Sequence, residues 1–461
     1  MKLSRSLSVD PPINDQYIII MADKSQIKIR FITRDEDESL HVEDKPLYVP
    51  ISLKRYGLSE IVNHLLETES PVPFDFLING TLLRTSIEEY LTTQGLSSEA
   101  FLTVEYTRAV LPPSYLASFN NEDWVSSLDI GYGRILSGSY DGIVRTWDMS
   151  GKVQKQYAGH SGAIKAVAWV SETRVVSAGN DRQVRLWKAH AVDDVSLDQA
   201  DDDEPEAGKT LAILEGHKAP ISALAVNDNR ILSAGYDNAI GFWSTNYKEM
   251  VSIDPLEDSQ NKVTSTAAKK RRKLALQDAS VRRRAPLAFM EGHSQPVEAV
   301  MFDAHDNTVA YSASQDHTIK TWDLVTSRAV DTRTTGFSLL SMVQLPKLNL
   351  IACGSSARHI TLHDPRADAA TITQSQLVGH TNFVVSLAAS PDSEYMFASG
   401  SHDGTVKVWD VRAQKALYTI TRESGEKKSK VFAVKWGQEG IVSGGEDKKI
   451  QINTGVQSQS A

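Results

Sequence analysis

The chain has 461 residues and a formal net charge of −9; 41% of its residues are hydrophobic and 23% are charged. This length exceeds one ordinary domain, so we expect two domains, or one domain with a large repeat array. The one cysteine, Cys353, excludes an intramolecular disulfide and favours a reducing compartment. No apolar run approaches the roughly 18 residues of a membrane span, so no membrane partner is expected.

Residues 1–22 are expected to be an extension outside the folded domains. The apolar run 17–21 is too short for the core of a signal peptide, and Asp15 lies beside it. Met21 resembles an alternative start of the chain.

Residues 23–108 contain no repeat and predict a small α+β domain. Ile61, Leu65 and Leu66 would form the apolar face of its helix, and Asn79-Gly80 marks a turn. The order of elements resembles the ubiquitin-like β-grasp fold. We expect strands over 26–33, 47–52, 74–78 and 102–106, and a helix over 58–66.

Residues 109–454 repeat a unit of about 40–45 residues, a period that indicates a repeat architecture. Four units share one spacing: a His comes first, a Ser lies four residues before an Asp, and a Trp lies six residues after that Asp. Buried polar groups are costly unless they are paired, so the spacing predicts a hydrogen-bonded relay in each unit. The four sets are His160, Ser177, Asp181 and Trp187; His217, Ser233, Asp237 and Trp243; His293, Ser312, Asp316 and Trp322; and His380, Ser399, Asp403 and Trp409.

Three further units keep part of this pattern. Their counterparts of the four positions are Asn121, Ser137, Asp141 and Trp147 in the first unit; Cys353, Ala357 and His363 in the fifth; and Ser443, Asp447 and Asn453 in the seventh. Tight hairpins are expected where Asp is followed by Gly or Asn in these units, because those residues tolerate a positive φ.

The repeat resembles the WD-repeat family in its period and in its Trp-Asp endings at 147–148, 322–323 and 409–410. The resemblance implies an all-β seven-bladed WD-repeat propeller beside the N-terminal α+β ubiquitin-like domain. Catalytic triads are the alternative interpretation of the His, Ser and Asp residues, but recurrence in every blade favours architecture. The last blade lacks a fourth strand, and we expect residues 114–119 to pair with it and close the ring. Residues 107–113 are the whole connection between the two domains, so a force on the small domain would reach this seam.

Two insertions interrupt the array, and residues 455–461 form a tail. The insertion at about 190–209 is acidic and is expected to be a solvated, disordered loop. The insertion at about 247–288 holds two basic clusters, which we interpret as a nuclear-import signal, with an RNA-phosphate contact or a merely solvated loop as alternatives. The clusters are Lys269, Lys270, Arg271, Arg272 and Lys273, and Arg282, Arg283 and Arg284.

The whole chain after Met21 resembles the family of WD-repeat subunits of the PeBoW complex, which works in assembly of the large ribosomal subunit and in pre-rRNA processing. The resemblance rests on segments such as 51–60 (ISLKRYGLSE), 109–116 (AVLPPSYL) and 355–364 (SSARHITLHD). It implies a scaffold of the nucleolus and nucleoplasm, bound to the pre-ribosomal large-subunit particle. The propeller would bind the Bop-type WD-repeat subunit, which bridges to Pescadillo. The small domain would bind the AAA ATPase midasin, which would drive release of the chain from pre-ribosomes.

The same resemblance assigns Glu99 as a ligand to the metal ion in midasin's metal site. Mg²⁺ prefers oxygen ligands and often keeps a position open for an incoming carboxylate. An ordinary exposed acid, like Glu88 or Glu89, is the alternative interpretation. No cofactor or metal of the chain's own is expected, because the Mg²⁺ would belong to the partner.

Trp124, Lys218 and Phe383 are the candidate interface residues of the propeller. Trp124 and Phe383 fall at one position of the repeat, where other blades have Ala or Pro, and Lys218 lies in a neighbouring loop. Large aromatic side chains on a rim suit a protein interface, although local packing within the loop is an equal alternative.

Three other functions were weighed against the scaffold. A substrate adaptor of a ubiquitin ligase is the main alternative, and the basic insertion does not favour it. A notchless-type protein has a similar small domain, but seven units without an eighth count against it. An enzyme is not expected, because the sequence holds no P-loop, no nucleophile elbow and no cluster of metal-ligand residues.

Overall fold

The computed structural model divides between Leu111 and Pro112 into two compact units, each described here by itself. The predicted boundary after residue 108 is three residues early, because the backbone N–H of Ala109 still donates to the carbonyl of Pro73 at 2.7 Å in the small unit. The extension at 1–22, the tail at 455–461 and the cluster at 269–273 lie outside the described residues. Those are 25–35, 37–67, 70–97, 99, 101–189, 206–253, 281–367, 375–413, 415–422 and 429–454.

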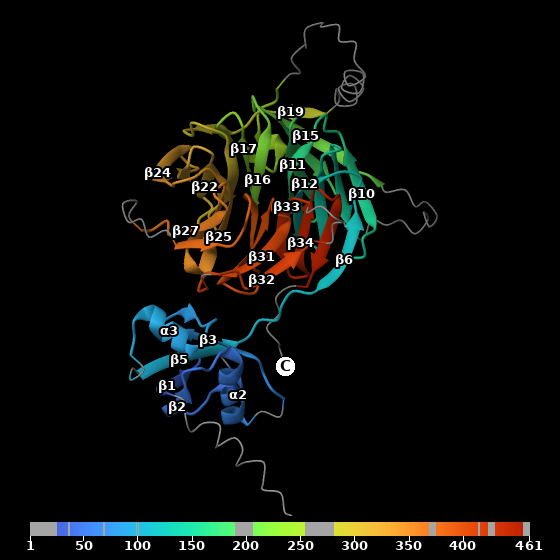
Figure 1. Ribbon diagram of the computed structural model, residues 1–461. Coiled ribbons are helices and arrows are strands. Elements are labelled where there is room, and N and C mark those ends of the chain that lie inside the picture. The colour runs from blue at the N-terminus through green and yellow to red at the C-terminus, as the bar shows by residue number, and fades with distance from the viewer. Residues whose placement is uncertain are drawn as a thin grey trace, which may run out of the picture. The chain divides into compact units, whose positions relative to one another are not determined.

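The small unit is a five-stranded mixed sheet with two helices, and it confirms the β-grasp prediction (Figure 1). The strand order is β2-β1-β5-β3-β4, so the last strand of the unit, β5, lies in the middle of the sheet. β5 is parallel to β1. The elements are β1 (Gln26–Ile32), η1 (Glu38–Leu40), β2 (Leu47–Pro50), α2 (Arg55–Leu66), β3 (Phe74–Ile78), β4 (Thr81–Leu82), α3 (Ile87–Gln94) and β5 (Phe101–Arg108).

Helix α2 packs on the sheet through Leu58 and Val62, which lie one turn apart and are fully buried. The predicted apolar face was therefore misplaced: Ile61 and Leu66 are partly buried, and Leu65 is 38% exposed. The turn predicted at 79–80 joins β3 to β4, with both of its residues at positive φ, as a tight hairpin requires.

Helix α3 was missed by the sequence analysis because just two of its eight residues, Ile87 and Leu91, are buried. It does carry a helix-start signal. The Ser86 side chain accepts a hydrogen bond from the backbone N–H of Glu89, and acidic residues occupy the first turn. The helix ends at Gly95, whose positive φ of 64° leads the chain into the turn before β5.

The large unit is a ring of seven antiparallel blades, which confirms the predicted seven-bladed WD-repeat propeller (Figure 1). The blades, from the innermost strand outward, have these strands. Blade 1 has β7 (Val125–Gly131), β8 (Arg134–Ser139), β9 (Ile143–Trp147) and β10 (Val153–Ala158); blade 2 has β11 (Ile164–Ser171), β12 (Arg174–Gly179), β13 (Gln183–Lys188) and β15 (Lys209–Glu215); blade 3 has β16 (Ile221–Asn227), β17 (Arg230–Gly235), β18 (Ala239–Ser244) and β20 (Ala288–Glu291); blade 4 has β21 (Val297–Phe302), β22 (Val309–Ser314), β23 (Thr318–Asp323) and β24 (Arg328–Thr334).

The remaining three blades complete the ring. Blade 5 has β25 (Leu339–Leu345), β26 (Leu350–Ser355), β27 (His359–His363) and β28 (Ser375–Val378); blade 6 has β29 (Val384–Ala389), β30 (Met396–Ser401), β31 (Thr405–Asp410) and β32 (Tyr418–Thr421); blade 7 has β33 (Val431–Gly437), β34 (Gly440–Gly445) and β35 (Lys449–Asn453), with β6 (Tyr115–Asn120) as its outer strand. Short 3-10 turns η3 (Tyr247–Glu249) and η4 (Pro346–Leu348) follow β18 and β25. Apolar side chains of neighbouring blades share buried clusters, so the core runs around the ring between the blades.

The ring closes through pairing of β6, which precedes blade 1 in the sequence, with β35 of blade 7. The two strands are antiparallel, and their register runs from Lys449 opposite Asn120 to Asn453 opposite Tyr115. This confirms that the segment predicted at 114–119 supplies the missing strand. Pairing removes an exposed edge that would otherwise be open to other chains.

The insertions each add a fifth strand to the preceding blade, so their predicted extents were too wide. β14 (Glu206–Ala207) pairs in parallel with β10 of blade 1, and β15 already begins at Lys209. In the same way β19 (Arg282–Arg284) pairs in parallel with β15 of blade 2, and β20 begins at Ala288. Covering the outer edge of a blade satisfies its free backbone groups, which is the physical reason for these short strands. No helix among the described residues is long and apolar enough to cross a membrane.

Candidate functional site

The structure brings together the four residues of each complete His-Ser-Asp-Trp set. His Nδ1 lies 2.7, 2.9, 2.8 and 2.8 Å from the Asp carboxylate in blades 2, 3, 4 and 6. His Nε2 lies 2.6–2.7 Å from the Ser hydroxyl. The same hydroxyl accepts the Trp indole N–H at 2.7–2.8 Å. In each set the hydrogen bonds therefore link Asp, His, Ser and Trp in one continuous chain.

These sets have the environment of structural groups. All four Ser side chains are fully buried, so none presents a hydroxyl to a substrate. Burial by itself would raise the pKa of Asp403, but hydrogen bonds from His380, Thr405 and the Thr381 backbone outweigh it and hold that pKa well below its usual range. The ionised Asp carboxylate accepts a hydrogen bond from the imidazole and so connects the hairpin to the loop that precedes it.

Blade 1 replaces the relay with an ion pair. Asn121, in the His position, donates to Ser139 at 3.0 Å and not to Ser137, which instead accepts from Trp147 at 2.8 Å. Arg145 lies 2.8 Å from Asp141 and is the cationic partner of that carboxylate.

Blade 7 uses an arginine that the sequence analysis did not identify. Arg422 donates to Ser443 at 2.7 Å and, through two nitrogens, to the Asp447 carboxylate at 3.0 and 2.9 Å. It follows β32 directly, at the position where the four complete units have the Gly that precedes His. Its longer side chain reaches the two groups that His contacts elsewhere. The seventh unit lacks both the His and the Trp of the pattern, and an Arg stands one residue before the position of the His. These two features could have identified Arg422 from the sequence.

Blade 5 retains no charged relay. His363, in the Trp position, is buried and contacts Thr361, with His363 Nε2 2.8 Å from the Thr361 hydroxyl. Burial lowers the pKa of His363 from 6.5 to about 4, and the nearby Arg333 acts in the same direction.

Acidification is therefore expected to destabilise the propeller through His363. Because the folded pKa lies below the unfolded one, the contribution is complete above about pH 6.5 and is lost as the pH falls toward 4. We expect the unfolding free energy to decrease by about 3 kcal/mol over this range from this group. Urea unfolding at pH 7, 5 and 4 measures it. His363→Gln is expected to remove that part of the pH dependence, and an unchanged profile in the variant would contradict the assignment.

An aromatic arc covers part of the rim on which the Asp-containing hairpins lie. Trp124 contacts Tyr140 and Phe432, with ring centroids 5.3 and 5.9 Å apart, and His402 joins Phe432 to Phe383 at 5.6 and 6.0 Å. The arc thus runs through blades 1, 7 and 6. Phe383 is 44% exposed and Trp124 is half-buried, so the two predicted aromatics both pack locally and leave surface free.

Lys218, the third predicted interface residue, lies in blade 3 and belongs to no part of this arc. Its side chain is exposed, and its backbone N–H donates to Asp237 at 2.8 Å. Tyr140 and His402 were missed, although each directly precedes the relay Asp of its unit. Phe432 was missed as the second residue of an innermost strand. These repeat positions point to the rim in every blade and could have been used as the signal.

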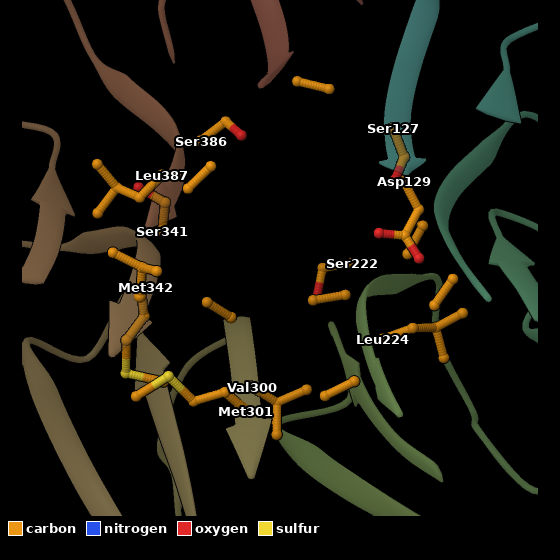
Figure 2. Close-up of a pocket in the computed structure, with 18 of the residues that line it drawn as sticks. Ser127, Asp129, Ser222, Leu224, Val300, Met301, Ser341, Met342, Ser386 and Leu387 are labelled. Carbon is orange, nitrogen blue, oxygen red and sulfur yellow. The ribbon is translucent and has the colours of Figure 1, made fainter. Parts of the chain in front are cut away.

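The arc borders a central channel of about 980 Å³. Figure 2 shows the innermost strands around it: Ser127 and Asp129 of β7 lie across the open space from Ser341, Ser386 and Leu387. The mix of hydroxyl, carboxylate and aliphatic groups provides no concentrated reactive centre.

Polar groups line the channel rim beyond the arc. Lys165 donates to the Tyr140 hydroxyl at 2.7 Å, which joins the arc to blade 2. On blade 4, the Glu298 carboxylate accepts from Gln315 at 2.5 Å. Burial raises the pKa of Glu298, and hydrogen bonds from Gln315 and Tyr236 offset part of the rise. One rim therefore combines an apolar half with a hydrogen-bonding half, as protein interfaces do.

Glu99 is exposed in the turn between α3 and β5 of the small unit. Its backbone N–H donates to the Ser97 hydroxyl at 3.2 Å, which fixes the turn without using the carboxylate. Phe101, 51% exposed, starts β5 two residues later and places an aromatic surface beside it.

The second basic cluster forms the short strand β19 at the outer edge of blade 2. Arg282 donates to the Tyr247 hydroxyl at 2.8 Å, and Arg283 forms an ion pair with Glu215 at 2.9 Å. Arg284 forms an isolated bridge with Ser252. The interpretation of this cluster and of Lys269–Lys273 as an import signal stays a prediction. Among the described residues, no group of three or more His, Cys, Asp or Glu is placed to hold a metal ion.

Fold and rim together define a WD-repeat β-propeller with a β-grasp domain at its N-terminus. Residues 27–91 match the family model of the NLE (NUC135) domain. Residues 284–323 and 372–410 match the WD domain, G-beta repeat, and residues 117–247 match a VPS11-like N-terminal beta-propeller.

The chain belongs to the family of ribosome biogenesis proteins named YTM1. It is 67% identical over 452 residues to the YTM1 protein of Saccharomyces cerevisiae, a match that covers 94% of this chain and 98% of the relative. It is 66% identical over 458 residues to the YTM1 protein of Candida albicans, covering 94% and 97% of the two chains. A solved WD40 beta-propeller domain of Doa1 is similar in fold, with a TM-score of 0.55 and 18% identity over 74% of this chain and 97% of that chain.

Proposed function

We propose that the protein is a non-catalytic scaffold of the PeBoW complex in assembly of the large ribosomal subunit, acting in the nucleolus and nucleoplasm. Its propeller binds the Bop-type subunit, and through it Pescadillo, while its small domain binds midasin on the pre-ribosomal particle. Midasin then drives release of the chain. Membership of a family of ribosome biogenesis proteins supports the pathway.

The exposed carboxylate of Glu99 carries the proposal for the small domain. An exposed carboxylate that has no hydrogen-bond or ion-pair partner among the described residues, and that lies in a turn, suits an open position on a partner's Mg²⁺ ion. The ion belongs to midasin, and this chain supplies one oxygen ligand. The propeller proposal rests on the aromatic arc with Trp124 and Phe383, because partly exposed aromatics beside hydrogen-bonding groups are typical of binding hot spots.

Glu99→Ala is expected to reduce the Mg²⁺-dependent binding of the full chain to midasin's metal-site domain by at least 100-fold, because a charged metal ligand is lost. Binding is measured by calorimetry with Mg²⁺ and with chelator. Glu88→Ala is the matched control, since Glu88 is an acid in the first turn of α3 and contributes no ligand in this proposal.

Each outcome of this measurement decides one point. Loss in Glu99→Ala with no loss in Glu88→Ala supports both the partner and the ligand. Binding that ignores both Mg²⁺ and Glu99 removes the ligand assignment. No binding of the wild-type chain would contradict the proposed partner.

A further inference from the structure

The linker and β6 form one mechanical path from the small domain to the propeller rim. β5 ends at Arg108, β6 begins at Tyr115, and Trp124 follows four residues after the end of β6. Along the chain, a load on the Glu99 turn passes through β5, the linker and β6 before it reaches blade 1. This inference rests on the proposed function, in which an ATPase holds that turn.

β5 transmits such a load without yielding. It is already extended, so tension between Glu99 and Ala109 finds no slack in it. It lies between β1 and β3 and pairs with both. Three of its side chains, Leu102, Val104 and Tyr106, are buried in the core of the small unit.

β6 is held much more weakly. It pairs with β35 on one side, and its burial pattern is mostly exposed, with Tyr115 and Leu116 more than half exposed. Phe119 supplies its main apolar contact, stacked on Trp147 with centroids 6.4 Å apart. At its start, Ser114 exchanges hydrogen bonds with Thr454, and these are the first to receive the load.

The end of β6 leads straight to the candidate interface. The backbone N–H of Asn121 donates to the Lys448 carbonyl at 2.7 Å, and Lys448 also contacts Glu122 and Asp123. The next residue is Trp124, whose ring packs on Phe432 of blade 7. Removal of β6 therefore transfers the load to the residue that joins blades 7 and 1 in the aromatic arc.

We infer that β6 is a pull-strand: tension on the small domain strips it from β35 before either unit unfolds, and then withdraws Trp124 from the rim. The innermost strands of blades 1 and 7 stay in place during this step, so the ring persists while its interface is dismantled. Release of a propeller-bound protein is thus coupled to pulling on Glu99.

An optical trap tests the order of events without any partner. Handles are attached through Gln94→Cys, at the exposed last residue of α3, and Val325→Cys, 78% exposed in blade 4; the native Cys353 is buried. Freeing residues 112–123 releases about 40 Å of chain at about 3.5 Å per residue, and the step is this length minus the span that the segment already covers in the folded propeller. We expect this short step as the first event. A first step of several hundred ångströms, from unfolding of the small unit or of whole blades, would overturn the inference.

A disulfide between Asn120→Cys and Lys449→Cys provides the matched control. These residues face each other in the antiparallel register, at a separation that a disulfide can span. Oxidised, the staple still leaves residues 112–119 free to be stripped, so it is expected to cut the first step to about two-thirds, and reduction is expected to restore it. An equal step in both states would contradict release of the chain beyond Asn120 toward Trp124.

A release assay then tests the coupling itself. With midasin and ATP, the oxidised staple is expected to slow release of the chain from its complex at least tenfold relative to the reduced form. An equal rate in both forms would overturn the coupling but leave the scaffold proposal intact. Absence of release in the reduced form would instead contradict the proposed function.

Discussion

Arg422→Ala is expected to lower the free energy of unfolding of the propeller by about 3–5 kcal/mol, because it leaves the Asp447 carboxylate buried without its counter-charge. Arg422 is 7% exposed and makes hydrogen bonds to Asp447, Ser443 and the Lys449 carbonyl. Burial lowers the pKa of Arg422, and the Asp447 charge counteracts that effect. The midpoint of urea unfolding at pH 7 measures the loss.

Two further variants separate charge from packing at this site. Arg422→Lys keeps the charge but loses the planar fork, so we expect a smaller loss of about 1–3 kcal/mol. Arg422→Ala combined with Asp447→Asn removes the unpaired charge, and we expect it to be more stable than Arg422→Ala alone. If Asp447→Asn gives no such rescue, the cost arises from lost packing and the ion-pair assignment is wrong.

Trp409→Ala is expected to cost about 3–5 kcal/mol, the range for removal of a large buried aromatic side chain. Trp409 is fully buried in the cluster between blades 5 and 6, and its indole N–H donates to Ser399 at 2.7 Å. The substitution opens a cavity and leaves the Ser399 hydroxyl with one partner fewer. Thermal or urea unfolding of the full chain gives the difference.

Trp409→Phe is the matched control, because it retains most of the ring volume and removes the N–H donor. We expect it to cost about 1–2 kcal/mol, the value of one buried hydrogen bond together with a small cavity. Equal losses in the two variants would show that the hydrogen bond and not the volume dominates at this position.

The small domain shows where local sequence signals stop. Alternating apolar residues predicted β1 well, because one side of that strand is buried, whereas β3 is a mostly apolar run that is buried along its whole length. The face of α2 was misassigned, since Ile61, Leu65 and Leu66 are apolar but the sheet lies against Leu58 and Val62. Hydrophobic periodicity predicts that a helix is amphipathic. Which of its apolar residues become fully buried depends on where the sheet packs against it.

The rim and the basic insertion show the same limit for function. Position in the repeat identified Trp124 and Phe383, but their connection through Phe432 and His402 depends on the closing of the ring between blades 7 and 1. The arginines at 282–284 appeared as an accessible signal, and pairing with the edge of blade 2 placed them in a strand. A run of charged residues in the sequence does not predict whether the segment can pair with a free strand edge in the folded protein.

The sequence by itself determined the architecture: the spacing of His, Ser, Asp and Trp specifies buried relays, and buried polar groups tolerate few alternative arrangements. It also determined the closing strand, because a three-stranded last blade leaves an edge that must be paired. The tertiary structure decided which residue completes the relay in blade 7, where Arg422 reaches from one position early. It likewise decided that β6 is held on one side while β5 is held on two, a difference that arises from long-range strand pairing and has no local signature.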